Sequence, residues 1–349
     1  MSSGENIKRF DQVSLADRLL VGGKGASLGE LTRAGVAVPP GFIICTSAFE
    51  QFLALVEKQD PVRFQVEALD DQHLDETTAL SDRLRKRFLN TPFPEGLRAQ
   101  IMAAHAELCG QQLNLPLAVR SSATSEDAED ASFAGLQDTY LWVQGAQATL
   151  GSIRACWASL YSAASISYRR KRRIPESTVA MAVVVQSMVD ARTAGVMFTR
   201  SPLTGDRSVV TIEATWGLGS ALVGGEVTPD RFVISKANCE VCLREIGDKH
   251  VQHLPAQGGG VKQQDTPQEL RQKPSLNDRE LAALTDLAVE VERHYGRAQD
   301  IEWAIDHSGQ NYVLQSRPET VWSSRDQQPV AKAAERPFMH VMKIFGGRR

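Results

Sequence analysis

The sequence lacks the features that mark a membrane or nucleic-acid-binding protein. Its longest apolar run, Val179–Val185, is far shorter than the roughly 20 residues of a bilayer-spanning helix. Its net charge is −3, so the chain has no global basic field to attract nucleic acid. The segment Met1–Lys8 is polar, and we expect no signal peptide there. These observations predict no membrane partner and no nucleic-acid partner.

Cysteine is scarce, and its placement favours a reducing compartment. The five cysteines do not pair off evenly. Cys239 and Cys242 have CxxC spacing, but they fall in a strand-like segment, where residues three apart face opposite ways. No second pair accompanies them, which disfavours zinc. We therefore expect free thiols and a cytoplasmic location.

What the chain does contain is an α+β alternation with room for several packed lobes. Residues 60–115 read as helices, and the chain becomes β-rich from Val179 onwards. Two capping boxes predict helix starts, one from Ser47 with Glu50 and one from Asn277 with Glu280. The polar stretch 258–273 is expected to be a mobile loop. The basic run 169–173 is expected to end a helix in solvent, with a partner or nucleotide contact as the alternative.

Two strand-like segments near the end of the chain predict a hairpin around Ser308-Gly309. A two-residue turn there sets Glu302 opposite Gln315 and Asp300 opposite Arg317, with all four side chains on one face. An acid pair, an amide oxygen and a guanidinium suit Mg²⁺ that carries nucleotide phosphates. A cross-strand salt bridge on a solvated hairpin explains the same residues equally well.

Two further segments have the chemistry of phosphate binding. Lys24 lies in the glycine-rich stretch Val21–Glu30, just before a short helix that ends at Gly35, although the spacing is not that of a Walker A loop. The strand-like segment Leu117–Arg120 leads into a polar loop, 121–139, that is rich in hydroxyls around one glycine. Each feature alone has an ordinary structural explanation, since glycines turn chains and arginines pair with surface acids.

Taken together, seven motifs in order resemble one family over about residues 15–322. The motifs are GGKGASLGEL, VPPGF, VRSSATSEDAEDASFAGLQDTYL, AMAVVVQSMV, AGVMFT, GLGSALVGGEVTPDRF and DIEWA with LQSRPE. With these motifs the chain resembles the N-terminal nucleotide-binding domain of phosphoenolpyruvate synthase and pyruvate phosphate dikinase, which has an ATP-grasp fold.

The resemblance implies a role for individual residues. Lys24, Arg120 and Arg317 would bind the phosphates of ATP, and Glu302 with Gln315 would bind Mg²⁺. Asp300 would be a supporting or second-metal carboxylate. The remaining implied positions are Gln186, Met188 and Val189 for adenine, Glu213 for ribose, and Gly135 and Thr139 for the loop over the phosphates.

It also implies two lobes with the nucleotide between them. We expect an N-terminal lobe over residues 1–185 and a C-terminal lobe over residues 186–322. Residues 323–349 would form a linker and a docking helix, because Phe338, Val341, Met342 and Phe345 have helical spacing. Packing of this stripe on the chain's own domain is an equal alternative, and membrane-surface binding is a weaker one.

In the family, this domain transfers the β-phosphoryl group of ATP to a histidine on another domain and yields AMP and phosphate. None of the seven histidines stands in the family's phosphohistidine context. The resemblance therefore implies a partner that carries this histidine. Phenylphosphate synthase, which divides these parts between subunits and phosphorylates phenol, is the first expectation.

Other interpretations remain open. One is a truncated phosphoenolpyruvate synthase or the ATP domain of an antibiotic phosphotransferase. Another is a carboxylate-amine ligase with an ATP-grasp fold, which would release ADP. The last is an ATP-sensing module without catalysis, which the retention of Lys24, Arg120, Glu302, Gln315 and Arg317 disfavours.

Overall fold

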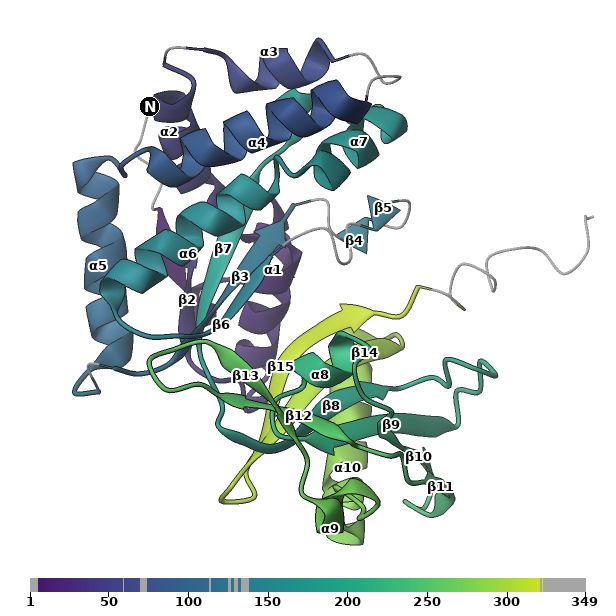
Figure 1. Cartoon of the computed structure of the whole chain (residues 1–349). Coiled ribbons are helices and arrows are strands. Elements are labelled where there is room, and N and C mark those ends of the chain that lie inside the picture. The colour runs from purple at the N-terminus through teal and green to yellow at the C-terminus, as the bar shows by residue number, and fades with distance from the viewer. Residues whose placement is uncertain are drawn as a thin grey trace, which may run out of the picture.

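Two antiparallel β-sheets organise the chain, one from each half of the sequence (Figure 1). The computed structural model describes residues 6–58, 60–69, 74–112, 114–124, 127–128, 131–132, 138–320 and 322. The first sheet has the order β1 (Ile7–Arg9), β2 (Gly41–Ile44), β7 (Met181–Ser187), β3 (Leu117–Ala123) and β6 (Thr139–Val143). The second has the order β11 (Val241–Glu245), β10 (Asp230–Ser235), β9 (Val209–Trp216), β8 (Ala191–Phe198), β14 (Gln299–Asp306) and β15 (Asn311–Pro318).

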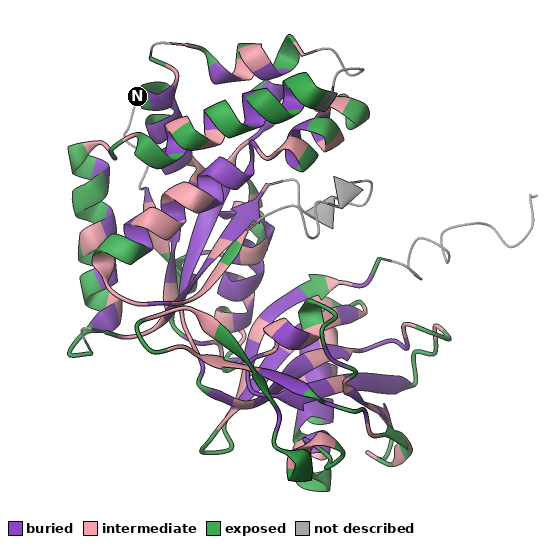
Figure 2. Ribbon diagram, in the orientation of Figure 1, coloured by how far each residue is buried: buried purple, intermediate pink, exposed green. Residues whose placement is uncertain are grey.

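Helices cover both faces of the first sheet, as the burial colours of Figure 2 show. In β7, Val183 and Val185 face a large cluster with helices α2 (Thr46–Val56), α4 (Leu74–Asn90) and α6 (Ala146–Ser159). Ala182 and Val184 face the other way, onto α1 (Arg18–Arg33). A strand buried on both faces has no polar alternation, which explains its continuous apolar sequence. The remaining helices of this half are α3 (Val62–Glu67), α5 (Glu95–Cys109) and α7 (Ala163–Arg172).

The second sheet is covered on one face by the long helix α10 (Asp278–Tyr295). Leu281, Leu284 and Val291 of this helix pack against Trp303 and Ile301 of β14. The predicted capping box of α10 is confirmed, because Asn277 and Glu280 bond reciprocally. The one predicted for α2 is wrong, since Cys45 is the N-cap and the Ser47 hydroxyl donates to Asn6.

A separate hairpin corrects the expectation of a loop at 258–273. Strands β12 (Val251–Pro255) and β13 (Val261–Asp265) form their own two-stranded sheet. The hairpin rises from the second half of the chain toward β6 of the first half (Figure 1). Two short helices, α8 (Ser220–Val223) and α9 (Gln268–Arg271), lie on either side of it in the sequence.

The α+β fold class is confirmed. The first sheet ends with β7 at Ser187 and the second begins with β8 at Ala191, so the chain crosses between sheets at residues 188–190. The expected boundary between 185 and 186 falls inside β7. The expected linker and docking helix, residues 323–349, lie outside the described residues. No helix in the described ranges is long and apolar enough to cross a membrane.

The basic run differs from the expected solvated helix end. Arg169 is 1% exposed, and its Nε donates to Glu176 Oε1 at 2.8 Å. Arg170 donates to the carbonyl oxygens of Glu67 and Leu69. Only the later residues of the run, such as Lys171, are exposed. Arg169 and Arg170 therefore connect α7 to neighbouring segments through hydrogen bonds.

This pair yields a stability prediction. Glu176→Gln should lower the free energy of unfolding by about 3 to 5 kcal/mol, because it leaves the Arg169 charge buried without its counter-ion. Lys171→Gln is the control, at an exposed residue in the same turn of α7 as Arg169. It should change the free energy of unfolding by less than about 0.5 kcal/mol. Urea denaturation followed by circular dichroism measures both variants. Equal losses of unfolding free energy in the two variants would show that the buried ion pair contributes no more than an exposed charge.

Candidate nucleotide and metal site

The hairpin β14–β15 has the predicted pairing at its four candidate site residues. Asp300 lies opposite Arg317, and Glu302 lies opposite Gln315. The turn itself is longer than expected, because Asp306 N donates to Gln310 O around three loop residues. A β-bulge restores the pairing: Glu302 pairs with Gln315 and Trp303 with Val313, which leaves Leu314 as the extra residue.

Arg120 joins the two sheets at this bulge. Its Nη2 donates to Glu302 Oε2 at 2.6 Å and to Gln315 Oε1 at 2.8 Å. Its Nη1 donates to the Leu314 carbonyl at 2.9 Å, which is the carbonyl that the bulge removes from regular pairing. The expected phosphate-binding arginine thus lies directly against the two expected metal ligands. Thr139 is its cross-strand neighbour on β6.

The glycine-rich segment forms a bend within α1 that is pinned to β3. Gly22 has φ +69, and a Cβ there would lie 2.0 Å from the Ser122 carbonyl oxygen. The Ser122 hydroxyl donates to Val21 O at 2.8 Å and accepts from Gly25 N at 3.1 Å. This contact fixes the start of the helical turn that carries Lys24. Ser122 lies in β3 rather than in the polar loop that the sequence predicts.

The expected ribose ligand lies in line with Glu302 on the second sheet. Val196 of β8 pairs with both Glu302 and Glu213, and Glu213 also pairs with Arg231 of β10. Directly paired residues share a face, so these side chains form one row across four strands. The row places Glu213 two strands away from the hairpin acid.

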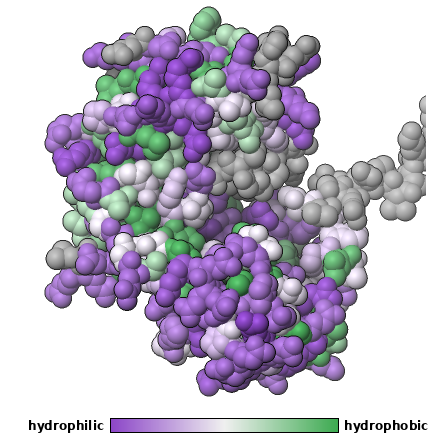
Figure 3. All heavy atoms as spheres, viewed as in Figure 1, coloured by the Kyte–Doolittle hydropathy of each residue, from purple (hydrophilic) through white to green (hydrophobic). Residues whose placement is uncertain are grey.

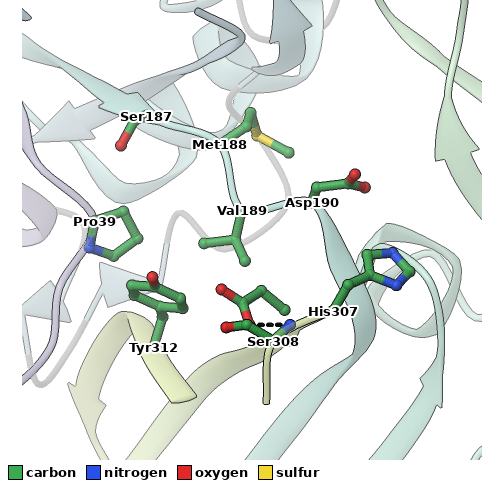
Figure 4. A pocket seen from close by; sticks show the side chains of 9 residues that line it. Pro39, Ser187, Met188, Val189, Asp190, His307, Ser308 and Tyr312 are labelled. Atoms are coloured by element: carbon green, nitrogen blue, oxygen red, sulfur yellow. Dashed lines mark hydrogen bonds between the residues drawn. The ribbon is translucent and has the colours of Figure 1, made fainter. Parts of the chain in front are cut away.

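The link between the sheets carries the expected adenine residues. Met188 and Val189 line a hollow of about 330 Å³ with Pro39, His307 and Tyr312, here called the hinge hollow (Figure 4). Gln186 is buried, and its amide nitrogen donates to Pro39 O at 3.2 Å. Gly135 lies outside the described residues.

A larger groove runs along β6 and was not predicted. It has a volume of about 710 Å³ and is lined by Thr139–Gln144, by α6, by Ser220 and Glu226, and by the β12–β13 hairpin. Trp142 lines this groove and also packs, as Met188, Val261 and Leu314 do, against the buried cluster of Val189, Ala191, Ala194, Leu218 and Ala304. Its side-chain direction depends on a bulge that strand alternation does not reveal. We call this hollow the β6 groove.

The surroundings of the two hairpin acids, Glu302 and Asp300, shift their pKa values in opposite directions. Burial opposes ionisation of Glu302, but the charge and hydrogen bond of Arg120, with Lys24 and Arg317, outweigh it and lower its pKa. Burial raises the pKa of Asp300 to about 6, against the attraction of Arg317, whose Nε lies 3.5 Å away. Burial also raises the pKa of Glu213, which Arg231 opposes.

The hairpin residues fit a magnesium ion. Glu302, Asp300 and Gln315 supply oxygen donors on one face, and the Asp300 Oδ1 atom is buried with no hydrogen-bond partner in the described structure. Within the described ranges, no cluster of three or more His, Cys, Asp or Glu side chains forms a complete metal cage. A partial set of oxygen ligands completed by phosphate is the usual arrangement for Mg²⁺.

Comparison with known proteins places this geometry in a family. Residues 18–337 match the family described as pyruvate phosphate dikinase, AMP/ATP-binding domain. The chain belongs to this family. It is therefore an AMP/ATP-binding domain of the pyruvate phosphate dikinase family, as the motifs predicted, and the expected ATP-grasp class agrees with the two-sheet architecture.

Curated relatives are much longer proteins. A probable phosphoenolpyruvate synthase of Staphylothermus marinus is 39% identical over 380 residues, covering 99% of this chain and 45% of that protein. A second, from Methanothermobacter thermautotrophicus, is 40% identical and covers 93% and 48%. A rifampicin phosphotransferase of a Streptomyces species is 39% identical and covers 91% and 36%. The chain thus spans less than half the length of these relatives.

The raised pKa of Asp300 predicts a pH dependence of stability. The folded protein holds this proton up to about pH 6, whereas the unfolded chain releases it near pH 4, so stability falls as pH rises between these values. Asp300→Asn should therefore be more stable than the wild type at pH 7.5, by roughly 1 to 3 kcal/mol. The difference should shrink toward pH 4. Denaturant unfolding at both pH values measures it.

Asp306 in the same hairpin is the matched control. Burial tends to raise its pKa, but hydrogen bonds from Ser308 and from the backbone of the loop outweigh burial and lower it. Its contribution is present at neutral pH and is lost as pH falls, so Asp306→Asn should be less stable at pH 7.5 and approach the wild type in acid. A pH-independent loss for Asp300→Asn would contradict a proton-holding Asp300.

Proposed function

We propose that this chain binds Mg²⁺-ATP between its two sheets and passes the β-phosphoryl group to a histidine on a partner subunit, giving AMP and phosphate. The observation that carries the proposal is the triple contact of Arg120 with Glu302, Gln315 and the Leu314 carbonyl. A partly buried salt bridge between two sheets contributes little net stability for its desolvation cost, and charged groups of this kind cluster at functional sites.

We assign the phosphates to three cations. Lys24 comes from the bend in α1, Arg120 from β3 and Arg317 from β15. Lys24 and Arg317 both act on the charge of Glu302, which indicates that the cations converge on one region. Fixed positive charges of this kind stabilise a phosphoryl group as its charge redistributes during transfer.

The acids divide the remaining work. Glu302 and Gln315, with Asp300 beside them, would hold Mg²⁺, which would neutralise phosphate charge and orient the chain of phosphates. Arg120 pairs with Glu302 through its Nη2 atom. We infer that Arg120 exchanges part of this contact for phosphate oxygens when nucleotide binds. The ionised state of Glu302 is already in place for a metal.

The nucleoside end lies toward the link between the sheets. We assign Met188, Val189 and Gln186 to the adenine, Glu213 to the ribose, and Gly135 with Thr139 to the loop over the phosphates. The position of Thr139 supports a role beside the phosphates, because Thr139 is exposed and pairs across the strands with Arg120. We propose two lobes on either side of the crossing at 188–190, a few residues after the boundary expected between 1–185 and 186–322.

The acceptor histidine belongs, in this proposal, to another domain or subunit. His105 lies buried beside Cys109, His253 bonds Ser220 and Glu226, and His294 bonds Glu30. These contacts occupy the imidazoles away from the hairpin acids. The length of the curated relatives supports further domains in the working enzyme.

Phenol is our first proposal for the final acceptor, as in phenylphosphate synthase. Pyruvate or an antibiotic hydroxyl is the alternative, which the names of the curated relatives support. We place the reaction in the cytoplasm, where ATP is available. A carboxylate-amine ligase would release ADP instead of AMP, so the nucleotide product separates that class of enzyme.

The proposal predicts strong effects at the hairpin. Glu302→Gln and Arg317→Ala should each lower the rate of phosphoryl transfer at least about 100-fold, because each removes a fixed charge beside the phosphates. Glu290→Gln, on the exposed face of α10, is the matched control and should leave the rate unchanged. Circular dichroism checks that all three variants fold.

The assay uses β-labelled ATP and the protein that co-purifies with this chain. Label should appear on a histidine of that protein, together with AMP. Stable label on this chain, ADP as the product, or wild-type rates in both hairpin variants would reject the proposal.

A further inference from the structure

Trp142 has a backbone conformation that its position in the sequence does not explain. Its φ is +57, in the left-handed region that side chains other than Gly, Asn and Asp rarely adopt. Among the described residues, Arg173 and Cys239 are the other non-glycine cases. Arg173 ends α7, and Cys239 lies in the turn between β10 and β11, both ordinary places for such a residue. Trp142 lies inside strand β6.

A bulge in β6 accounts for this geometry. Val119 pairs with Tyr140 and Leu117 with Val143, so Leu141 and Trp142 together stand opposite Ala118. Bulges of this type normally place glycine in the left-handed position. A tryptophan there is strained, and such strain at a cleft points to a function for the side chain.

The backbone and the side chain of Trp142 make different contacts. Its carbonyl accepts a hydrogen bond at 2.9 Å from Gly260 N, at the turn of the β12–β13 hairpin. Its side chain is half-buried against the cluster that contains Val189 and Leu218, and it also lines the β6 groove. The side chain thus stands at the junction of the groove and the link between the sheets.

The opposite side of the groove leaves room beside the indole. Gly258, Gly259 and Gly260 line it in succession, with φ of +86, +106 and +80. Residues with side chains are strained in these conformations, so the turn presents backbone alone. A groove of about 710 Å³ lies within the usual range for small-molecule sites.

The groove also has the correct polarity along its length for a nucleotide. Thr139 at one end is the cross-strand neighbour of Arg120, which faces the expected phosphate region. Trp142 follows three residues later, about 10 Å along the strand. This separation leaves space for a ribose and a phosphate between a charged end and an aromatic end.

We propose that the Trp142 indole is a stacking platform for the purine base of ATP, positioned by the strained bulge of β6. This proposal rests on the proposed function and adds a base-binding residue to it. Base–aromatic stacking contributes roughly 1 to 3 kcal/mol per base. Trp142 is half-buried against the cluster that includes Val189, which holds the side chain, and it lines the β6 groove, where a base can reach it.

Trp142→Asn and Trp142→Phe separate the side chain from the backbone strain. Asparagine tolerates the left-handed conformation, so Trp142→Asn should fold with an unchanged or higher melting temperature. It should nevertheless bind ATP at least about tenfold more weakly, because the stack is lost. Trp142→Phe keeps a ring and should stay within about threefold of the wild type. Trp322→Phe, at a half-buried tryptophan that does not line the groove, is the matched control.

Inorganic tripolyphosphate distinguishes the base from the phosphates. Calorimetry in the presence of Mg²⁺ should give equal affinities for this base-free probe in the wild type and in Trp142→Asn. ATP should also quench tryptophan emission in the wild type and in Trp322→Phe more than in Trp142→Phe, while tripolyphosphate should not.

The outcomes are distinct for the two proposals. Unchanged ATP affinity in Trp142→Asn, or a parallel loss of ATP and tripolyphosphate affinity, would overturn the stacking role. Trp142 would then be only a structural contact between the sheets. Either result leaves the proposed function standing. Failure of the wild type to bind ATP at all would instead reject the proposed function.

Discussion

The contact of Arg120 with the β14–β15 hairpin is the interaction on which the site depends. Arg120 comes from β3, next to the edge of the first sheet, and its three acceptors lie on β14 and β15, the last two strands of the second. A planar guanidinium with donors in a fixed fork can satisfy a carboxylate, an amide and a backbone carbonyl at once. Lysine could not replace this geometry. The position of one sheet over the other is therefore specified by a residue that also has the charge to hold phosphate.

Helix α1 provides the second connection between the sheets. Ser27 donates to the Ser316 carbonyl at 2.6 Å, and Ser122 holds the bend at Gly22 against β3. The helix therefore carries Lys24 while it is fixed at one end to the first sheet and along its side to β15. Mostly hydrophilic residues cover the molecular face in Figure 3, with apolar side chains in patches between them.

Several motif residues have a structural explanation that differs from ligand binding. Gly195 allows β8 to approach β9, because a Cβ there would lie 1.9 Å from the Glu213 carbonyl oxygen. Asp230 is fully buried and accepts from Lys249, from Gly247 N and from Ser275. It organises the loops around β10. The motifs therefore mix residues that shape the second sheet with residues that face the nucleotide, and spacing alone does not separate them.

The sequence by itself determined the local features. Period-two alternation and one turn signal predicted the pairs Asp300–Arg317 and Glu302–Gln315, and the glycine-rich bend before the α1 turn was readable as well. The pairing was correct although the turn was not, because the longer loop and the bulge at Leu314 offset each other. Such compensation leaves no local signature.

Only the tertiary structure decided which of these features meet. Arg120 and Glu302 are 182 positions apart, and nothing in either segment encodes their hydrogen bond. The same holds for buried Arg169, for the β12–β13 hairpin and for Trp142, whose direction depends on a bulge against β3. Sequence periodicity reports the face on which a side chain lies within its own element. The partner on that face is selected by packing between elements, where burial and hydrogen bonding of distant segments outweigh local preference.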